Sequence, residues 1–249
     1  MQVCSVAEVI NLSDFCDRRL LAIVPARGGS KRLPRKNLLS LGGKPLIAWT
    51  LDAAIQSGCF VDVIVSTDDA EIAEAAQAHG ALVPWLRPAE FATDTARSID
   101  VVLHALDWYE HERGTVIGVM LLQPTSPFRS AATISEAVAR FLELGSDPPL
   151  VSVSPAENHP AWTFSLRGTL MQPFCGWDGL KLRSQELPEA YTLNGAIYLS
   201  TPARLRATHS FYAEDMHALI MPNFAESQDI DTVEDWERAV RLHATLVSN

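Results

Sequence analysis

The sequence has few cysteines and no long apolar run. Its four cysteines show neither the spacing of metal ligands nor a disulfide framework, and scattered thiols suit a reducing compartment. No apolar run reaches the roughly 20 residues that a membrane span needs. The first residues include Glu8, Asp14 and Asp17 in place of a basic region, which argues against a signal peptide. We therefore expect a cytoplasmic protein that interacts with no membrane.

Two common nucleotide-binding motifs are also absent. Gly28-Gly29 lacks the G-x-G-x-x-G spacing that hydride-transferring enzymes need. Residues 38–45 do not form a Walker phosphate loop, because Leu38 and Pro45 replace the first glycine and the final serine or threonine of that motif. A net charge of −10 argues against a nucleic-acid surface, although one local basic site can still hold a nucleotide.

A basic loop, residues 27–36, contrasts with this acidic background. Five of its ten residues are Lys or Arg, and it follows an apolar run at 20–25 that is typical of a buried strand. Gly28 and Gly29 allow tight bending and close approach to a ligand, while exposed N–H groups and cationic side chains of such turns bind phosphate. The alternative is a solvated basic turn. The position after a first strand favours phosphate binding, because open α/β sheets bind ligands there.

Short apolar runs alternate with amphipathic stretches along the chain. The runs predict strands at 20–25, 61–65, 81–84, 116–122, 150–153, 196–199 and 218–221. The stretches predict helices at 46–55, 72–79, 99–106, 134–142, 202–206 and 233–247. This alternation indicates an α/β fold with a mostly parallel, doubly wound (Rossmann-like) sheet. We expect one domain at 20–249 after an N-terminal extension at 1–19.

Residues 155–193 interrupt the alternation. This segment contains four prolines and several aromatic residues, including Trp162, Phe174 and Trp177. It predicts a small β-rich subdomain that cannot bury its own apolar side chains, and exposed apolar patches usually mark an interface. We expect a two-fold homodimer formed through this inserted dimerisation subdomain.

Asp229 and Asp231 flank Ile230 near the end of the chain. In an extended segment alternate side chains point to one side, so both carboxylates share a face. Mg²⁺ prefers oxygen ligands and accepts one or two carboxylates together with phosphates. Alternatively, Asp231 caps the last helix and Glu234 completes a capping box, but Asp229 has no such role. We therefore predict a Mg²⁺ site at Asp229 and Asp231.

Six segments, taken in order, resemble the signature of one enzyme family. They are residues 27–37, 66–69, 87–90, 122–129, 194–198 and 229–232. They include the motifs Arg-Gly-Gly-Ser-Lys, Leu-Gln-Pro-Thr-Ser-Pro-Phe-Arg and Asn-Gly-Ala-Ile-Tyr. The set resembles the acylneuraminate cytidylyltransferases, which make CMP-activated sialic, legionaminic or pseudaminic acids. The resemblance extends from residue 20 to the C-terminus.

The resemblance implies transfer of CMP from CTP to the anomeric hydroxyl of a nine-carbon 2-keto sugar acid, with release of pyrophosphate. Positions that match the CTP site are Arg27, Ser30, Lys31, Lys36, Asn37, Arg87 and Ser98. Positions that match the sugar site are Gln123, Arg129, Asn194, Tyr198 and Phe211, with Arg183 reaching into the site of a neighbouring subunit. We expect Arg27, Lys31 and Asp229 to be catalytic, because charge builds on phosphate oxygens during the reaction.

Two other functions stay open: an eight-carbon ulosonate (KDO-type) cytidylyltransferase, and a non-catalytic nucleotide sensor on the same fold. The motif at 123–127 and Lys36-Asn37 argue against the first by resemblance. The terminal aspartates argue against the second, since a sensor needs no metal-binding pair. The sequence does not identify which nonulosonic acid is used.

Several polar residues also have simpler interpretations. Asp68 and Asp69 are better explained as helix caps than as catalytic groups. Ser98 is either an N-cap or a ligand contact at a helix N-terminus. Arg32 and Arg35 lie at variable positions of the resembled motif and are expected to be solvated.

Overall fold

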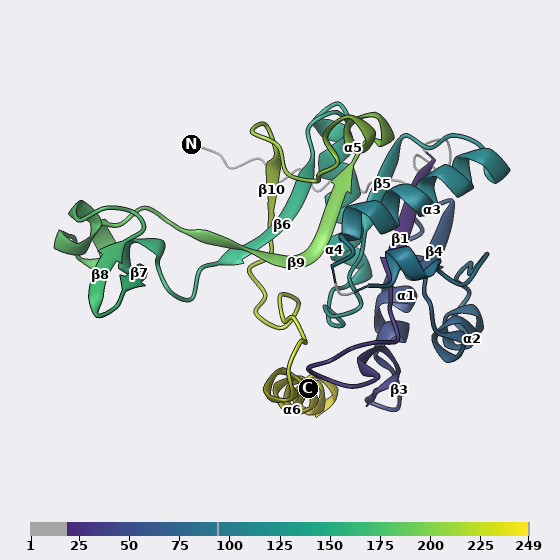
Figure 1. The fold of residues 1–249 in the computed structure, drawn as a ribbon, viewed down its shortest axis with the longest axis horizontal. Coiled ribbons are helices and arrows are strands. Elements are labelled where there is room, and N and C mark those ends of the chain that lie inside the picture. Colours follow the sequence, from purple (N-terminus) through teal and green to yellow (C-terminus); the bar gives the residue numbers. More distant parts are fainter. Residues whose placement is uncertain (1–18, 94, 249) are drawn as a thin grey trace, which may run out of the picture.

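A six-stranded sheet forms the centre of the molecule (Figure 1). The computed structural model describes residues 19–93 and 95–248, so most of the expected extension at 1–19 lies outside the described residues. The strands are β1 (Leu20–Pro25), β4 (Asp62–Ser66), β5 (Gly118–Leu121), β6 (Leu150–Pro155), β9 (Tyr191–Ser200) and β10 (His217–Ile220). Their order across the sheet is β10-β6-β9-β5-β1-β4. The predicted α/β fold with a mostly parallel sheet is confirmed.

Helices cover both faces of this sheet because strand residues alternate between two cores. Leu20, Ala22 and Val24 of β1 pack in one core with α1 (Leu46–Gln56), α2 (Ala70–Ala78) and α4 (Ala131–Glu143). Leu21 and Ile23 pack in the other core with α3 (Ser98–Arg113) and α5 (Pro202–Thr208). The interior strand β1 is therefore buried on both faces, as its continuous apolar sequence predicts.

The last helix, α6 (Val233–Ser248), belongs to a third, smaller core. That core includes Leu41 of the hairpin formed by β2 (Ser40–Leu41) and β3 (Lys44–Pro45), together with Ile230 and Ala239. Because the hairpin continues directly from the basic loop, this packing fixes the C-terminal aspartates against that loop.

Strand β9 departs from the parallel arrangement. It runs antiparallel to both β5 and β6 and is ten residues long, whereas the sequence predicted a strand only at 196–199. Its pairing with β6 is irregular: Val151 lies opposite Tyr198, but Val153 lies opposite Leu193. Residues 194–197 of β9 thus have only Ser152 opposite them, and Gly195 adopts a positive φ of 76°.

The inserted segment 155–193 forms an arm that projects away from the sheet (Figure 1). Its far end contains a hairpin of β7 (Phe164–Arg167) and β8 (Leu170–Pro173), and the ends of β6 and β9 connect it to the body. Phe174 and Leu170 are 72% and 70% exposed, so the arm leaves large apolar side chains in solvent. Its expected role in dimerisation stays a prediction.

One local prediction is wrong, and one open alternative is decided. Residues 81–84 form no strand; Leu82 makes only an isolated parallel bridge with Ile64 at the edge of the sheet. The N-cap of α3 is Arg97 rather than Ser98, and no side chain among the described residues caps that helix. Ser98 is the first helical residue, which places its hydroxyl beside a cavity.

Candidate active site

A basic cavity of about 510 Å³ lies where the chain leaves the carboxyl ends of β1, β4 and β5. Parallel strands end at the same edge of a sheet, so the loops that follow them meet there. The structure brings seven predicted CTP-site residues to the walls of this cavity: Arg27, Ser30, Lys31, Lys36, Asn37, Arg87 and Ser98. Gln123 and Asp231 line it as well.

Two aspartates after β4 hold the basic loop in place. Asp68 accepts a 2.9 Å hydrogen bond from the Gly28 N–H group. Asp69 caps α2 by accepting from the N–H groups of Glu71 and Ile72 at 2.9 and 3.2 Å, which confirms the capping interpretation for this residue. A Cβ atom at Gly28 would lie 2.6 Å from Asp69 Oδ2. Glycine is therefore required here by the close approach of Asp69.

This arrangement corrects two expectations about the loop. The Gly28 N–H group donates to the Asp68 carboxylate, so it does not contribute to an anion-binding turn. Asp68 does not cap a helix. The loop gains further rigidity from Asn37, which is buried and donates from Nδ2 to the Arg27 carbonyl at 3.0 Å.

Arg87 is buried at the edge of the basic cavity. Its guanidinium donates to the Ser66 carbonyl, to Ser66 Oγ at 3.0 Å and to the Phe91 carbonyl at 3.4 Å. Burial lowers the pKa of Arg87 to about 10, partly offset by the nearby Asp68 charge. The residue therefore anchors its own loop to the end of β4 while it adds positive charge to the cavity wall.

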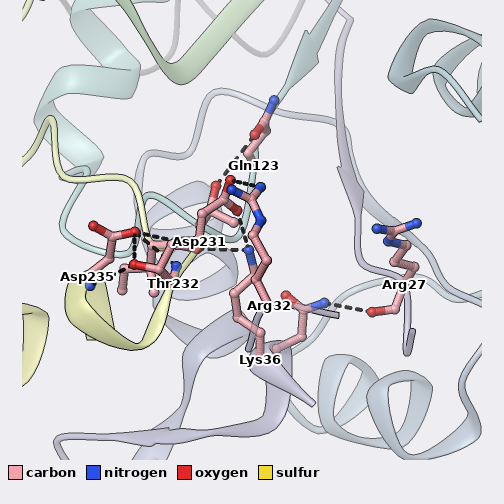
Figure 2. A network of polar contacts seen from close by, with 10 residues as sticks. Arg27, Arg32, Lys36, Gln123, Asp231, Thr232 and Asp235 are labelled. Atoms are coloured by element: carbon pink, nitrogen blue, oxygen red, sulfur yellow. Dashed lines mark hydrogen bonds and ion pairs between the residues drawn. The ribbon is translucent and has the colours of Figure 1, made fainter. Parts of the chain in front are cut away.

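Asp231 accepts hydrogen bonds from two cations of the basic loop (Figure 2). Lys36 Nζ lies 2.7 Å from Asp231 Oδ1 and also donates to the Ile230 carbonyl at 2.8 Å. Arg32 Nη2 lies 2.6 Å from Asp231 Oδ2. Partial burial raises the pKa of Asp231, but Lys36 and Arg32 lower it more, so that the pKa lies below its ordinary value. This carboxylate is thus kept ionised beside the cavity.

This network does not support the alternative interpretation in which Asp231 caps the last helix. The capping pair of α6 is Thr232 and Asp235: Asp235 N donates to Thr232 Oγ1 at 3.2 Å, and Thr232 N donates to Asp235 Oδ2 at 2.9 Å. Arg32 and Arg35 are exposed, as expected, but each also forms an ion pair. Arg32 pairs with Asp231, and Arg35 lies 2.8 Å from Glu71.

A second cavity of about 790 Å³, which we call the arm-side cavity, begins next to the first. Gln123 lines both cavities. Two predicted sugar-site residues, Asn194 and Tyr198, also line the arm-side cavity, and so does the predicted metal ligand Asp229. Burial of the Asp229 carboxyl raises its pKa; a hydrogen bond with Thr125 opposes this shift and the Asp231 charge adds to it.

An aromatic recess of about 300 Å³ opens beside Gln123 as well. Phe211 and Tyr212 line it, and their ring centroids lie 5.8 and 6.0 Å from that of Tyr198. Burial and the neighbouring Tyr212 hydroxyl raise the pKa of Tyr198. Ser98 lines this recess and the basic cavity, so it has access to ligands in either.

Two predicted sugar-site residues lie outside these cavities. Arg129 is only 1% exposed, and its guanidinium donates to the Ala196 carbonyl and to Thr50 Oγ1, so we withdraw the prediction that it contacts the sugar directly. Arg183 is exposed on the arm and lines neither cavity of its own chain. Its predicted reach into a neighbouring subunit stays a prediction.

The sequence interpretation missed some lining residues. Arg32 lines the basic cavity, although its position in the resembled motif is variable. Tyr212 lines the aromatic recess and directly follows Phe211, which the resemblance indicates. Glu157 of the arm lines the arm-side cavity and no motif indicates it. Only the fold places these residues, because each comes from a loop whose path the sequence pattern leaves open.

Comparison with known proteins identifies the family. A family model described as cytidylyltransferase matches residues 21–236. The chain belongs to the cytidylyltransferase family. Among curated cytidylyltransferases, it is 44% identical over 226 residues to the CMP-N,N'-diacetyllegionaminic acid synthase of Legionella pneumophila, covering 90% of this chain and 96% of that protein.

Two other cytidylyltransferases are also similar. The N-acylneuraminate cytidylyltransferase of Escherichia coli is 37% identical over 90% of this chain and 52% of its own length. The pseudaminic acid cytidylyltransferase of Campylobacter jejuni is 32% identical over 90% of this chain and 95% of its own.

Solved structures of cytidylyltransferases support the fold. A CMP:2-keto-3-deoxy-manno-octonic acid synthetase complexed with CTP aligns with a TM-score of 0.68 at 18% identity, over 92% of this chain and 99% of that one. In the part of the chain that the structure describes, no helix is both long and apolar enough to cross a membrane.

Proposed function

We propose that the protein transfers CMP from CTP to the anomeric hydroxyl of a nonulosonic acid. The observation that carries the proposal is the junction at Gln123, where a basic cavity meets a second cavity large enough for a sugar. The hydroxyl oxygen bonds to the α-phosphorus of CTP, the bond from that phosphorus to the pyrophosphate oxygen breaks, and the hydroxyl proton is lost. The name of the 44% identical relative supports N,N'-diacetyllegionaminic acid as the first sugar to test.

The basic cavity is suited to a triphosphate. Arg27, Lys31 and Lys36 line it, and charge-assisted hydrogen bonds from such groups to phosphate oxygens are strong. In nucleotidyl transfer, negative charge develops on the α-phosphate and on the leaving pyrophosphate. Cations that are already positioned stabilise that charge without reorganisation during the reaction. We assign this role to Arg27 and Lys31.

Asp229 and Asp231 suit a hard cation such as Mg²⁺. Both provide carboxylate oxygens, and the raised pKa of Asp229 reflects burial and the negative field of Asp231, which a bound cation would relieve. The described residues contain no cluster of three or more potential metal ligands. Mg²⁺ does not need such a cluster, because it usually takes one or two carboxylates and completes its shell with phosphates and water. When bound, Mg²⁺ supplies charge neutralisation at the phosphates.

The arm-side cavity supports a homodimer. Two carboxylates, Glu157 and Asp229, line this cavity, whereas the described residues of its lining include no Lys, Arg or His. A sugar acid brings a third carboxylate, so a cationic side chain from elsewhere would favour its binding in addition to Mg²⁺ at Asp229. Arg183 lies exposed on the apolar arm, and we propose that the arm of a second copy inserts this residue.

Pyrophosphate release tests the proposed activity. The protein is incubated with CTP, Mg²⁺ and a panel of N,N'-diacetyllegionaminic, N-acetylneuraminic, pseudaminic and eight-carbon ulosonic acids. We expect pyrophosphate and a CMP-sugar with a nine-carbon acid, and none with ATP in place of CTP. Binding of CTP without turnover on any acid would instead support a nucleotide sensor. The cytoplasmic location stays a prediction.

A further inference from the structure

The side chain of Arg129 is a buried cation outside the cavities that the proposed reaction uses. It follows the Gln123–Phe128 loop, one residue before the N-cap of α4, and is 1% exposed. No carboxylate forms an ion pair with it among the described residues, and its Nε–H has no hydrogen-bond acceptor there. Burial lowers the pKa of Arg129 to about 9. Burying a charge without an ion partner is costly for stability, so the hydrogen bonds that hold Arg129 in place need an explanation.

The hydrogen bonds of Arg129 join two strands where their pairing stops. The β5–β9 ladder ends at Leu121 opposite Tyr198. Beyond that point Arg129 Nη1 donates to the Ala196 carbonyl of β9 at 2.6 Å and, more weakly, to the Gln123 carbonyl at 3.5 Å. The guanidinium thus continues the connection between the two strands past the last paired residues.

A second contact fixes the guanidinium from the opposite side. Arg129 Nη2 donates to Thr50 Oγ1 of α1 at 3.0 Å, and Thr50 Oγ1 donates to the Gln123 carbonyl at 3.4 Å. Thr50 is fully buried. The planar fork of an arginine can bind several acceptors at fixed angles, which a lysine ammonium cannot copy.

The acceptor on β9 belongs to the irregular stretch at 194–197. Backbone groups released from the ladder must find other partners when they are buried. The Ile197 N–H group donates to Ser152 Oγ at 2.8 Å, the Ala196 N–H group donates to Asn194 Oδ1 at 3.1 Å, and the Ala196 carbonyl accepts from Arg129. Side chains therefore satisfy this stretch in place of a neighbouring strand.

Irregular strand segments of this kind re-aim side chains beside active sites. Asn194 and Tyr198, on either side of Ala196, both line the arm-side cavity. Gln123, whose carbonyl faces Arg129 and Thr50, lines that cavity and the basic cavity. In the proposed function, the two substrates would meet beside Gln123, Asn194 and Tyr198, and Arg129 holds the backbone that carries these residues.

We propose that Arg129 is a positioning residue, which locks the irregular segment 194–197 of β9 to the end of β5 and thereby fixes the sugar-site geometry of Asn194, Tyr198 and Gln123. The expected loss in sugar kinetics rests on the proposed function, whereas the expected change in the rigidity of segment 194–197 does not. A misplacement of about 1 Å caused by a residue away from the chemistry can cost about 10²-fold in rate.

The first measurement is amide hydrogen exchange in Arg129→Met, with Arg140→Met as the matched control. Arg140 lies exposed on the same helix, α4, and lines none of the three cavities. We expect faster exchange at 194–197 in Arg129→Met, while amides of β1 and the melting temperature change little, since methionine fills an apolar space without a buried charge. Wild-type exchange at 194–197 would overturn the proposal, whatever reaction the protein catalyses.

The second measurement separates sugar from nucleotide in steady-state kinetics. We expect Arg129→Met to lose about 10²-fold in kcat/KM for the sugar acid, with an unchanged dissociation constant for CTP, and Arg129→Lys to recover part of the loss. Equal losses for both substrates would refute a role confined to the sugar site. If Arg129→Met does not fold, Ser152→Ala loosens the same segment and must reproduce the exchange and the kinetic split. Absence of turnover in the wild-type protein would count against the proposed function alone.

Discussion

Arg27 provides the most direct test of the basic cavity. It follows β1 by two residues, its carbonyl is held by Asn37 and its guanidinium reaches the cavity. Replacing it with alanine removes a positioned cation where the proposed reaction builds negative charge. Loss of one such donor typically lowers turnover by about 10²–10³-fold, or about 2.7–4 kcal/mol of transition-state stabilisation. We expect a loss of this size in kcat/KM for CTP.

The same substitution is expected to affect folding little. The bond from Arg27 Nη1 to the Thr93 carbonyl is 3.4 Å long, at the limit of hydrogen-bond geometry. Arg27 is only partly buried on the cavity wall, and we expect its replacement to change the free energy of unfolding by no more than about 0.5 kcal/mol. Arg27→Lys retains the charge but not the planar fork, so it should recover only part of the rate.

The assay is initial-rate pyrophosphate release at varied CTP, combined with calorimetric CTP binding and thermal unfolding. The control is Arg140→Ala, because Arg140 is exposed and lines none of the three cavities. Arg32 is unsuitable, since its ion pair with Asp231 links it to the site. Equally small kinetic losses at Arg27 and Arg140 would show that the basic loop does not stabilise the reacting phosphates.

Three further predictions concern the metal, the arm and the loop support. Asp229→Asn should abolish Mg²⁺-dependent turnover without changing the melting temperature; wild-type activity in this variant would remove Asp229 from the metal site. Phe174→Glu should shift the light-scattering mass from dimer to monomer, because Phe174 is 72% exposed on the arm; a wild-type protein that is already monomeric and fully active would contradict this. Asp69→Ala should lower the free energy of unfolding by about 0.5–2 kcal/mol through loss of the α2 cap, measured by urea denaturation, and an unchanged midpoint would show that the cap contributes nothing.

The strand and helix pattern of the central sheet could be read from the sequence because its residues face two buried cores. Continuous apolar runs such as residues 20–25 have no other stable location than between helix layers. The direction of β9 could not be predicted in this way. Its alternation is broken at Gly195, and its pairing depends on side chains from distant segments, among them Ser152 and Arg129.

The cationic wall of the basic cavity was likewise predictable, since Arg27, Lys31 and Lys36 follow the first strand and strand ends bind ligands. The partners of those cations were not predictable. Lys36 and Asp231 are 195 residues apart in sequence, and only the packing of α6 on the β2–β3 hairpin brings them to 2.7 Å. Local sequence rules also allowed a capping role for Asp231, but its carboxylate instead accepts hydrogen bonds from two distant cations.

That ion pair changes how the basic loop should be understood. Asp231 forms ion pairs with both Lys36 and Arg32, and Glu71 pairs with Arg35, so at least three of the five cations have carboxylate partners among the described residues. The local charge is therefore smaller than the sequence suggests, which is consistent with a cationic loop being stable in a protein of net charge −10. An incoming triphosphate must compete with Asp231 for Lys36 and Arg32. A cation bound at Asp231 would reduce that competition, so nucleotide and metal should bind with mutual reinforcement rather than independently.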